Sequence, residues 1–204
     1  MTRGKAPGSD TPLPADGRRA RSTTSRSKIV AAMLELVRSG NHSPQAAQVA
    51  ELAGVGVRSV FRHFADMETL YREMGEAITR QVLPIIQQAP TGGTWKQKLR
   101  DTAHRRFIVF ETIMPYRISA GLRRFQSPYL MDDYNRLNAL EVALVKAQLP
   151  PTLAEDLVSQ RALILVLSFK AWCTLRQDHG LQIEEAQAVT LRLLEQVMAN
   201  LPDD

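Results

Sequence analysis

The stretch SPQAAQVAELAGVGVRSVFRHF, residues 43–64, predicts two short helices joined by a tight turn. Ser43 can cap the first helix, with a proline at the first helical position, where a missing N–H costs nothing. That helix is predicted to run to about residue 53. Gly54 follows it and can take the positive φ that ends many helices, and the second helix begins near Val57. The pattern is typical of a helix-turn-helix.

The apolar residues of this stretch predict how its two helices pack. In the first helix we expect Val49 and Leu52 to face a core, while the small Ala50 lets another helix cross closely over it. In the second helix, Val60 and Phe64 lie four residues apart and therefore point back at the first helix. The remaining face of the second helix is left open to solvent.

Hydrogen-bond donors gather on that outer face, which carries Arg58, Ser59, Arg62 and His63. Such side chains suit phosphates and base edges, so we expect Arg58 and Arg62, one helical turn apart, to reach a DNA major groove. An alternative for Arg62 is a solvated surface charge. The other predicted contacts with DNA are Ser59, Phe61 and His63, which help fix the docking, and Arg26, Ser43 and Gln45, which meet the backbone.

Three segments carry a resemblance to a known family: IVAAMLELVRSG (29–40), AAQVAELAGVGVRSVFRHF (46–64) and ADMETLY (65–71). Residues 26–71, about 46 in all, resemble the N-terminal DNA-binding domain of TetR-family transcriptional regulators. The sequence departs from the family pattern at three positions. Gly56 stands where Ser is usual, Arg58 where Gly is usual, and Met67 where Lys is usual. The departures concern the DNA contacts and leave the expected fold unchanged.

The resemblance implies a function as well as a fold. In that family a dimer binds operator DNA, the C-terminal helices hold a small-molecule site, and the bound effector separates the DNA-binding heads. We therefore expect a transcriptional regulator of the repressor kind, released from double-stranded operator DNA by a small-molecule effector. Two alternatives stay open: an activator or effector-insensitive DNA-binding regulator, and, more remotely, a helical enzyme.

The positive charge of the chain is concentrated near its N-terminus. The net charge is +5; residues 1–66 hold ten Lys or Arg against five Asp or Glu, whereas residues 67–204 hold sixteen of each. This asymmetry favours a polyanionic partner at one end of the molecule. Residues 1–24 are rich in Gly, Pro, Ser, Thr and Arg, so we expect a disordered basic arm that either follows DNA or is only a solvated tail.

Several other classes of protein lack support in the sequence. The single Cys173 cannot form an internal disulfide, and the sequence shows no N-terminal apolar segment of the kind found in signal peptides, so a cytoplasmic location is expected. The longest apolar run, residues 162–167, is far too short to cross a bilayer. The four histidines are scattered, and we expect no metal and no cofactor. The GVGVRS segment, residues 54–59, follows a helix rather than a strand, which argues against a dinucleotide-binding loop.

Helical periodicity accounts for the rest of the chain, and no segment alternates long enough to predict a strand. Further helices are predicted over residues 25–39, 67–88, 94–114, 116–125, 128–148, 153–176 and 183–200, with Pro115 ending the helix before it. Three of them have a predicted N-cap, namely Asp66, Thr94 and Ser127. The fold class is all-α with about nine helices. Three domains are expected: the arm (1–24), a helix-turn-helix DNA-binding domain (25–71), and a helical ligand-binding and dimerisation domain (72–204).

One arginine in the helix predicted over residues 94–114 lies on an otherwise apolar face. That face holds Trp95, Leu99, Ala103, Phe110, Ile113 and Met114, and Arg106 falls inside it. A buried guanidinium needs a partner. It can pair with a carboxylate or reach the surface, or it can line a cavity and bind an apolar effector that carries one acceptor group. The predicted ligand-binding residues are Arg106, Phe107, Phe110, Tyr116 and Trp172.

The last two helices are the predicted dimer interface. Residues 157–175 are apolar nearly all round, and residues 183–200 add a second apolar stripe that includes Leu193 and Val197. The family resemblance implies that these helices form a four-helix bundle between two subunits. The alternative is that both stripes belong to the core of a single subunit.

Overall fold

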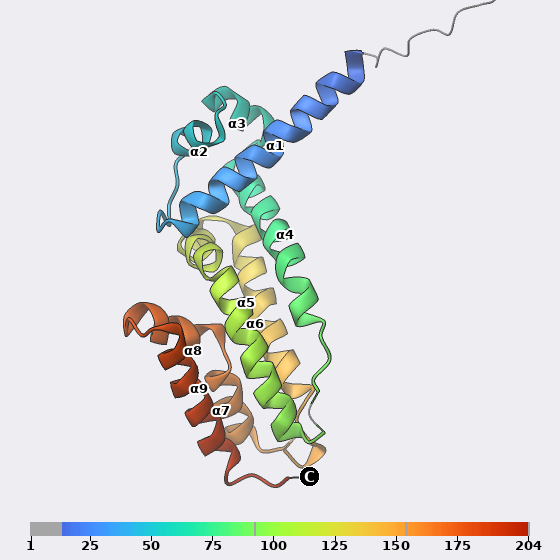
Figure 1. Cartoon of the computed structure of the whole chain (residues 1–204), viewed down its shortest axis with the longest axis vertical. Coiled ribbons are helices and arrows are strands. Elements are labelled where there is room, and N and C mark those ends of the chain that lie inside the picture. Colours follow the sequence, from blue (N-terminus) through green and yellow to red (C-terminus); the bar gives the residue numbers. More distant parts are fainter. Residues whose placement is uncertain (1–13, 92, 154, 204) are drawn as a thin grey trace, which may run out of the picture.

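The computed structural model describes residues 14–91, 93–153 and 155–203, and within these ranges it contains nine α-helices and no strand (Figure 1). This confirms the predicted all-α fold with about nine helices. The helices are α1 (Pro14–Arg38), α2 (Ala46–Ala53), α3 (Val57–His63), α4 (Met67–Ile86), α5 (Trp95–Arg123), α6 (Pro128–Lys146), α7 (Leu157–Val166), α8 (Phe169–Cys173) and α9 (Ile183–Met198). Short helical turns at Arg124–Gln126, Pro151–Leu153 and Thr174–Asp178 join some of them.

The buried apolar side chains form two clusters. One cluster lies at one end of the molecule, among α1, α2, α3 and the first half of α4. We term this part of the molecule the head. The other lies among α5, α6, α7, α8 and α9, which we term the body. Tyr116, Ala120 and Leu130, from α5 and α6, belong to the head cluster. Head and body therefore share packing, and α4 runs from one into the other (Figure 1).

The first helix is longer than predicted. It begins at Pro14 rather than near residue 25, so residues 14–24, expected to be disordered, are helical. A proline at the start, an acidic residue in the first turn and several arginines all favour helix, and this local propensity outweighs the polar composition. Residues 1–13 of the predicted arm lie outside the described residues. The first part of α1 projects beyond the head (Figure 1).

The helix-turn-helix is confirmed, with two corrections. Gln45, not Ser43, occupies the capping position of α2, because the chain is still extended there and the Gln45 N–H donates to Gln48 Oε1 over 2.9 Å. Leu52 was predicted to face the core and is 50% exposed. Gly54 adopts the expected left-handed conformation, with φ of 65°. The four other apolar positions are buried as predicted, namely Val49, Ala50, Val60 and Phe64.

Two helix boundaries in the body were predicted wrongly. Pro115 does not end α5, which continues to Arg123. A proline removes one backbone hydrogen bond, but α5 is buried on both sides of it, through Met114, Tyr116 and Ser119 among others, and this packing holds the helix together. Conversely, the single helix predicted over residues 153–176 is divided into α7 and α8, which bend by 42° relative to each other.

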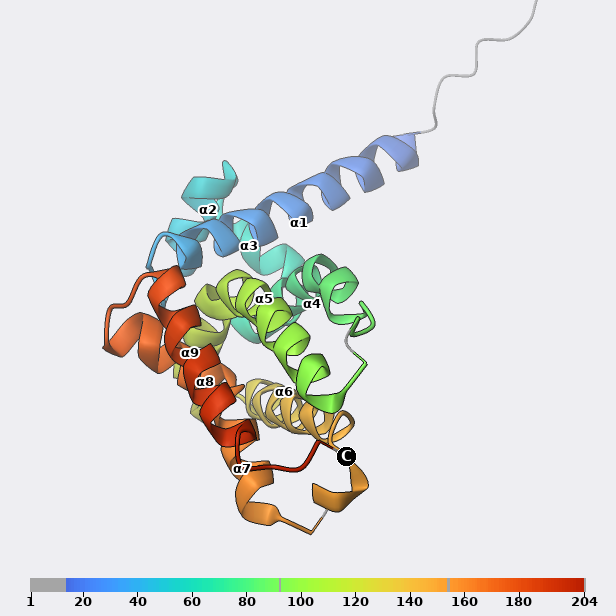
Figure 2. The same ribbon diagram turned by 60° about the horizontal axis from the view of Figure 1, so that its bottom comes forward.

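No single helix in the described parts of the chain is long and apolar enough to cross a membrane. The bent pair of segments 157–166 and 169–178 meets that requirement when taken together, on length and composition alone. In the structure α7 and α8 lie against α5, α6 and α9 (Figures 1 and 2), and Leu163, Leu167 and Trp172 are among the most deeply buried side chains of the body. Much of the apolar character of this segment therefore belongs to side chains in the body core.

Candidate nucleic-acid interface and ligand cavity

The outer face of α3 carries the predicted donors. The backbone is extended at Gly56, which is the N-cap residue, and α3 begins at the next residue, Val57. Arg58 and Arg62 are both exposed, and Arg62 Nη2 donates to Ser59 Oγ over 3.3 Å. Phe61 is 52% exposed, which is unusual for a large aromatic side chain in an otherwise packed head. The helix therefore presents two cations, a hydroxyl and an apolar ring to whatever docks against it.

His63 lies at the edge of this face and is half-buried. Its Nε2 is buried and has no hydrogen-bond partner among the described residues. Burial, together with the nearby charges of Arg62 and Arg26, lowers the pKa of His63 below its ordinary value. Burial and the two neighbouring arginines thus favour the neutral form of the imidazole in the free protein.

Arg26 was predicted to contact the DNA backbone, and in the structure its guanidinium is engaged inside the head. Its Nε donates to Glu73 Oε1 over 2.7 Å, and its Nη1 donates to the His63 carbonyl over 2.7 Å. The guanidinium also lies 4.6 Å from the centre of the Phe64 ring. Arg26 thus ties α1 to the end of α3 and to α4. A phosphate would have to compete with Glu73 for it.

Ser43 and Gln45, the other predicted backbone contacts, are exposed beside the first turn of α2. Gln45 Nε2 donates to the Ser43 carbonyl over 3.4 Å. The Ser43 hydroxyl accepts a hydrogen bond from Arg123 Nη2 over 3.1 Å, which links the head to the end of α5. Next to it, Ser119 Oγ donates to the His42 carbonyl over 2.8 Å. Sequence analysis missed this polar contact, because its partners lie about 80 residues apart.

The body contains a cavity of about 280 Å³ between α5 and α6, closed at one side by the end of α4. Its walls include Arg106 and Phe110, as predicted, together with Ile86, Thr102, Arg105, Val109, Ile113, Arg117, Leu137, Leu140, Glu141, Leu144 and Gln148. A second cavity of about 610 Å³ adjoins it, is lined by Tyr116, and shares Ile86, Val109, Ile113, Arg117, Leu137 and Leu140. The shared walls make the two cavities neighbouring lobes of one crevice among α4, α5 and α6.

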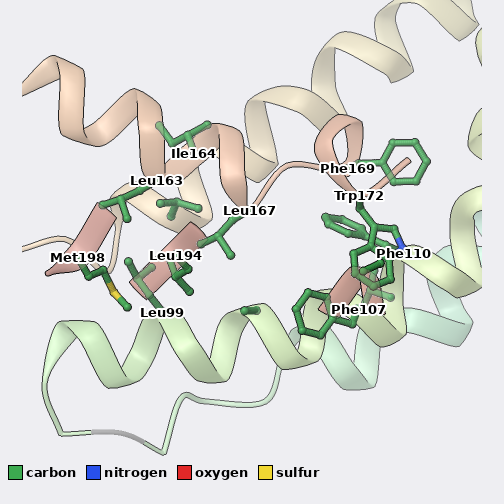
Figure 3. Close-up of a cluster of buried hydrophobic side chains, with 14 of the residues drawn as sticks. Leu99, Phe107, Phe110, Leu163, Ile164, Leu167, Phe169, Trp172, Leu194 and Met198 are labelled. Atoms are coloured by element: carbon green, nitrogen blue, oxygen red, sulfur yellow. The ribbon is translucent and has the colours of Figure 1, made fainter. Parts of the chain in front are cut away.

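Two of the five predicted ligand-binding residues do not line either lobe. Phe107 and Trp172 stack on each other in the body core with ring centres 4.8 Å apart (Figure 3). Trp172 Nε1 donates to Glu111 Oε1 over 2.8 Å, so the indole N–H is satisfied there. The prediction placed them in the cavity because helical periodicity identifies an apolar face without showing which part of that face is packed. Both residues are core.

Arg106 is buried and lines the cavity, as predicted. Its hydrogen-bond partners within the protein are neither a carboxylate nor surface water. Its Nη1 donates to the Leu167 carbonyl, and its Nη2 donates to the Glu141 carbonyl over 2.8 Å. Burial lowers the pKa of Arg106 to about 10, partly opposed by the charge of Glu141. The guanidinium is therefore still charged at pH 7. Backbone carbonyls satisfy it, instead of a paired carboxylate or surface water.

Arg117 and Glu141 form a second buried polar group at the junction of the two lobes. Arg117 Nη1 makes an ion pair with Glu141 Oε1, and Arg117 Nη2 donates to Asn138 Oδ1 over 3.1 Å. The Arg117 guanidinium lies 4.2 Å from the centre of the Phe169 ring, and the Phe169 N–H donates to Glu141 Oε2 over 2.9 Å. Sequence analysis identified neither Arg117 nor Glu141, since nothing local marks them as partners.

The two residues predicted for the dimer interface have different surroundings. Leu193 on α9 is 44% exposed, whereas Val197 is half-buried and packs against the body core. Other large apolar side chains are exposed on α7 and α9, two helices that pack against each other. They are Leu157, Val158, Leu165 and Val189. We term these four residues and Leu193 the α7–α9 face.

A three-helix head with an outward-facing second helix, joined through α4 to a helical body that contains a cavity, is the architecture of TetR-family transcriptional regulators. Comparison with solved structures supports this assignment of the fold, and three of the structures it finds are described as transcriptional regulators. A TetR-family regulator from Rhodococcus sp. superposes with a TM-score of 0.63 at 18% identity, over 85% of this chain and 98% of that one. A TetR-family regulator from Mesorhizobium loti superposes with a TM-score of 0.61 at 16% identity, over 88% of this chain and 97% of that one. A transcriptional regulator from Rhodococcus sp. Rha1 superposes with a TM-score of 0.61 at 15% identity, over 85% of this chain and 96% of that one.

These identities are low, and the likeness to the three regulators establishes the fold. No protein-family model and no curated protein matches the sequence. The chain thus has the TetR fold that residues 26–71 predicted, extended over the whole body.

Proposed function

We propose that the protein is a DNA-binding transcriptional regulator whose helix α3 enters the major groove. The observation that carries this proposal is the exposed face of α3, where Arg58 and Arg62 stand one turn apart in a helix-turn-helix of the TetR fold. Arginine side chains so placed can donate two hydrogen bonds to a guanine edge or neutralise a phosphate. The positive charge concentrated in residues 1–66 adds a sequence-independent attraction to DNA.

The first prediction concerns this helix. A preferred duplex is selected from randomised DNA with the full chain, and its Kd is measured at fixed salt for the parent and for Arg58→Ala. If Arg58 reads a base, the substitution costs about 1–3 kcal/mol and relaxes the preference at one position. Lys146→Ala, which removes an exposed cation at the end of α6 in the body, is the matched control and leaves the Kd unchanged. If the Arg58→Ala, Arg62→Ala double variant binds the duplex with unchanged affinity, α3 does not recognise the DNA.

We also propose that the cavity between α5 and α6 binds a small apolar effector with one acceptor group, and that binding weakens DNA affinity. The support is chemical: aliphatic side chains from three helices form the walls, and the Arg106 guanidinium lies among them. Such a site favours an elongated apolar molecule with a carboxylate or carbonyl at one end. Apolar carboxylates and aromatic compounds are screened for thermal stabilisation, and the hits are repeated with Arg106→Met. If every hit stabilises Arg106→Met as much as the parent, Arg106 does not bind the effector.

The direction of regulation follows from the same proposal. A protein that leaves DNA when the effector binds acts as a repressor. Expression of a reporter gene placed downstream of the selected duplex would therefore be low in the presence of the protein. Expression would rise when a stabilising compound is added. Higher expression with the protein alone would identify an activator instead.

We propose a homodimer as the functional assembly. Two half-sites about 34–36 Å apart on one face of DNA require two heads held at a fixed spacing, which a two-fold dimer supplies. The α7–α9 face supports this, because five large apolar side chains are exposed on two helices that pack against each other, and exposed apolar side chains often mark subunit interfaces.

A further inference from the structure

The break between α7 and α8 has a defined chemical construction. α7 ends at Val166, α8 begins at Phe169, and Leu167 and Ser168 lie between them. In an uninterrupted α-helix, each N–H bonds the carbonyl four residues earlier. The Phe169 N–H would then pair with the Leu165 carbonyl, and the Ala171 N–H with the Leu167 carbonyl. A break leaves these groups in need of other partners.

Each of these four groups has a substitute partner in the structure. The Phe169 N–H donates to Glu141 Oε2 over 2.9 Å, and the Ala171 N–H donates to Ser168 Oγ over 3.1 Å. The Leu165 carbonyl accepts from the Ser168 N–H over 3.1 Å and from Ser168 Oγ over 2.8 Å. The Leu167 carbonyl accepts from Arg106 Nη1. Two of the substitutes come from Ser168 itself, and the other two come from α5 and α6.

The two partners from α5 and α6 are walls of the ligand cavity. Arg106 and Glu141 both line it, and they are joined to each other by the bond from Arg106 Nη2 to the Glu141 carbonyl. Leu167 is buried, so its carbonyl cannot turn to water if Arg106 withdraws. A buried carbonyl without a partner is costly, and the only nearby donor that helix geometry offers is the Ala171 N–H.

We propose that the α7–α8 break is a joint controlled by the cavity. When an acceptor group of a bound ligand takes the Arg106 guanidinium, the Leu167 carbonyl pairs with the Ala171 N–H instead, and α7 and α8 become more nearly continuous. This inference rests on the proposed effector site and adds its means of regulation. Because α7 also carries Leu157, Val158 and Leu165 of the α7–α9 face, a change in the joint alters the surface on which the two subunits are proposed to meet.

The second prediction tests the joint without any ligand. Hydrogen–deuterium exchange is measured by mass spectrometry on the full chain, for peptides that span residues 167–173. Arg106→Met removes the donor to Leu167 while keeping an unbranched side chain of similar reach. If the helix closes, exchange in these peptides becomes slower by roughly tenfold, within the range that pairing one buried polar group contributes. Faster or unchanged exchange would mean that the break only loosens or persists, and would overturn the proposal.

Two further variants keep this test decisive if Arg106→Met folds poorly. Arg106→Leu removes the same donor with a shorter apolar side chain, so the Leu167 carbonyl again needs the Ala171 N–H and exchange at 167–173 again slows. Arg105→Met is the matched control. Arg105 also lines the cavity, but it donates to the Ala89 carbonyl over 3.2 Å and to Thr102, and it does not touch the break. Exchange at 167–173 is the same in Arg105→Met as in the parent.

Decanoate, an apolar carboxylate, separates the joint from the effector site. If decanoate stabilises the parent and slows exchange at 167–173, the joint responds to the cavity as proposed. If decanoate stabilises the parent and leaves that exchange unchanged, the joint is overturned while the effector site stands. If decanoate does not bind and the two variants still slow exchange, the joint stands and the proposed class of effector is wrong.

Discussion

Asp66 determines where the connecting helix α4 begins. Its Oδ1 accepts hydrogen bonds from the Thr69 N–H over 2.7 Å and from the Thr69 hydroxyl over 2.8 Å. These bonds lower the pKa of Asp66; burial opposes them slightly, and Arg72 adds a smaller favourable effect. The sequence predicted this cap correctly, because an N-cap depends only on residues within one turn of each other.

The third prediction follows from that lowered pKa. Asp66→Ala removes the cap and lowers the free energy of unfolding by about 1 kcal/mol at pH 7. A carboxylate whose pKa is depressed in the folded state stabilises it fully above the unfolded pKa, and loses this contribution as pH falls through the folded value. The difference between parent and Asp66→Ala, measured by urea denaturation, is therefore constant from pH 7 to 5 and shrinks below about pH 4. Asp66→Asn keeps the cap without titrating, so its stability relative to Asp66→Ala stays constant over the whole range.

Arg106 shows where prediction from single residues ends. Periodicity placed it correctly on a buried face, because the position of a residue around a helix is a local property. Its partners, Leu167 and Glu141, lie 61 and 35 residues away along the chain. Which of several acceptors meets a guanidinium depends on how distant helices cross, so the sequence identified the need for a partner and could not identify the partner.

At the scale of elements, α4 and α5 cross closely where Gly75 meets Tyr116. A Cβ placed on Gly75 would lie 2.7 Å from the Tyr116 hydroxyl oxygen and 3.3 Å from Cζ. Tyr116 is buried, and its hydroxyl donates to Asp133 Oδ2 over 3.4 Å. The glycine thus allows the connecting helix to approach the body. Tyr116 was predicted to be a ligand wall, and it also fixes this helix crossing.

The fourth prediction is a clash and its relief. Gly75→Ala lowers the free energy of unfolding by about 1–2 kcal/mol, since overpacking outweighs the better helix propensity of alanine. Adding Tyr116→Phe removes the atom in closest contact, and the double variant recovers at least half of the loss. Gly121→Ala on α5 is the control, because the added Cβ meets only the flexible Arg124 at 3.4 Å. Stabilisation by Gly75→Ala alone would show that Tyr116 moves aside freely.

The helix boundaries show what sequence patterns can and cannot decide at this scale. Caps and turns that depend on neighbouring residues were predicted correctly, as at Thr94 and Ser127. The helix end at Pro115 and the uninterrupted helix over residues 153–176 were predicted wrongly, for opposite reasons. Burial on both sides keeps α5 intact through the proline, whereas Arg106 and Glu141 from other helices stabilise a break that no proline or glycine marks. Both outcomes are set by tertiary contacts.

Across the whole molecule, head and body are joined by more than the connecting helix. The end of α5 contributes Tyr116 and Ala120 to the head core, and the hydroxyls of Tyr71 and Ser119 lie 2.6 Å apart across the boundary. Arg123 reaches Ser43 on the first turn of the helix-turn-helix. A shift of α5 or α4 at the proposed effector cavity would therefore reach the head through packed and hydrogen-bonded groups. In the proposed homodimer, two heads would respond together only if the bodies were held as a pair.

The fifth prediction concerns that pairing, and it contrasts two apolar residues of α9. Leu193 belongs to the exposed α7–α9 face, so Leu193→Asp yields a folded monomer in sedimentation, with a thermal transition close to that of the parent. The monomer binds a two-half-site duplex about 10²–10⁴-fold more weakly, because the second head no longer binds as part of one molecule. Val197 packs against the body core of its own subunit, so Val197→Asp buries a charge and destabilises the fold before it affects assembly. A dimer that persists in Leu193→Asp would exclude this face, and the heads would have to be paired through another surface.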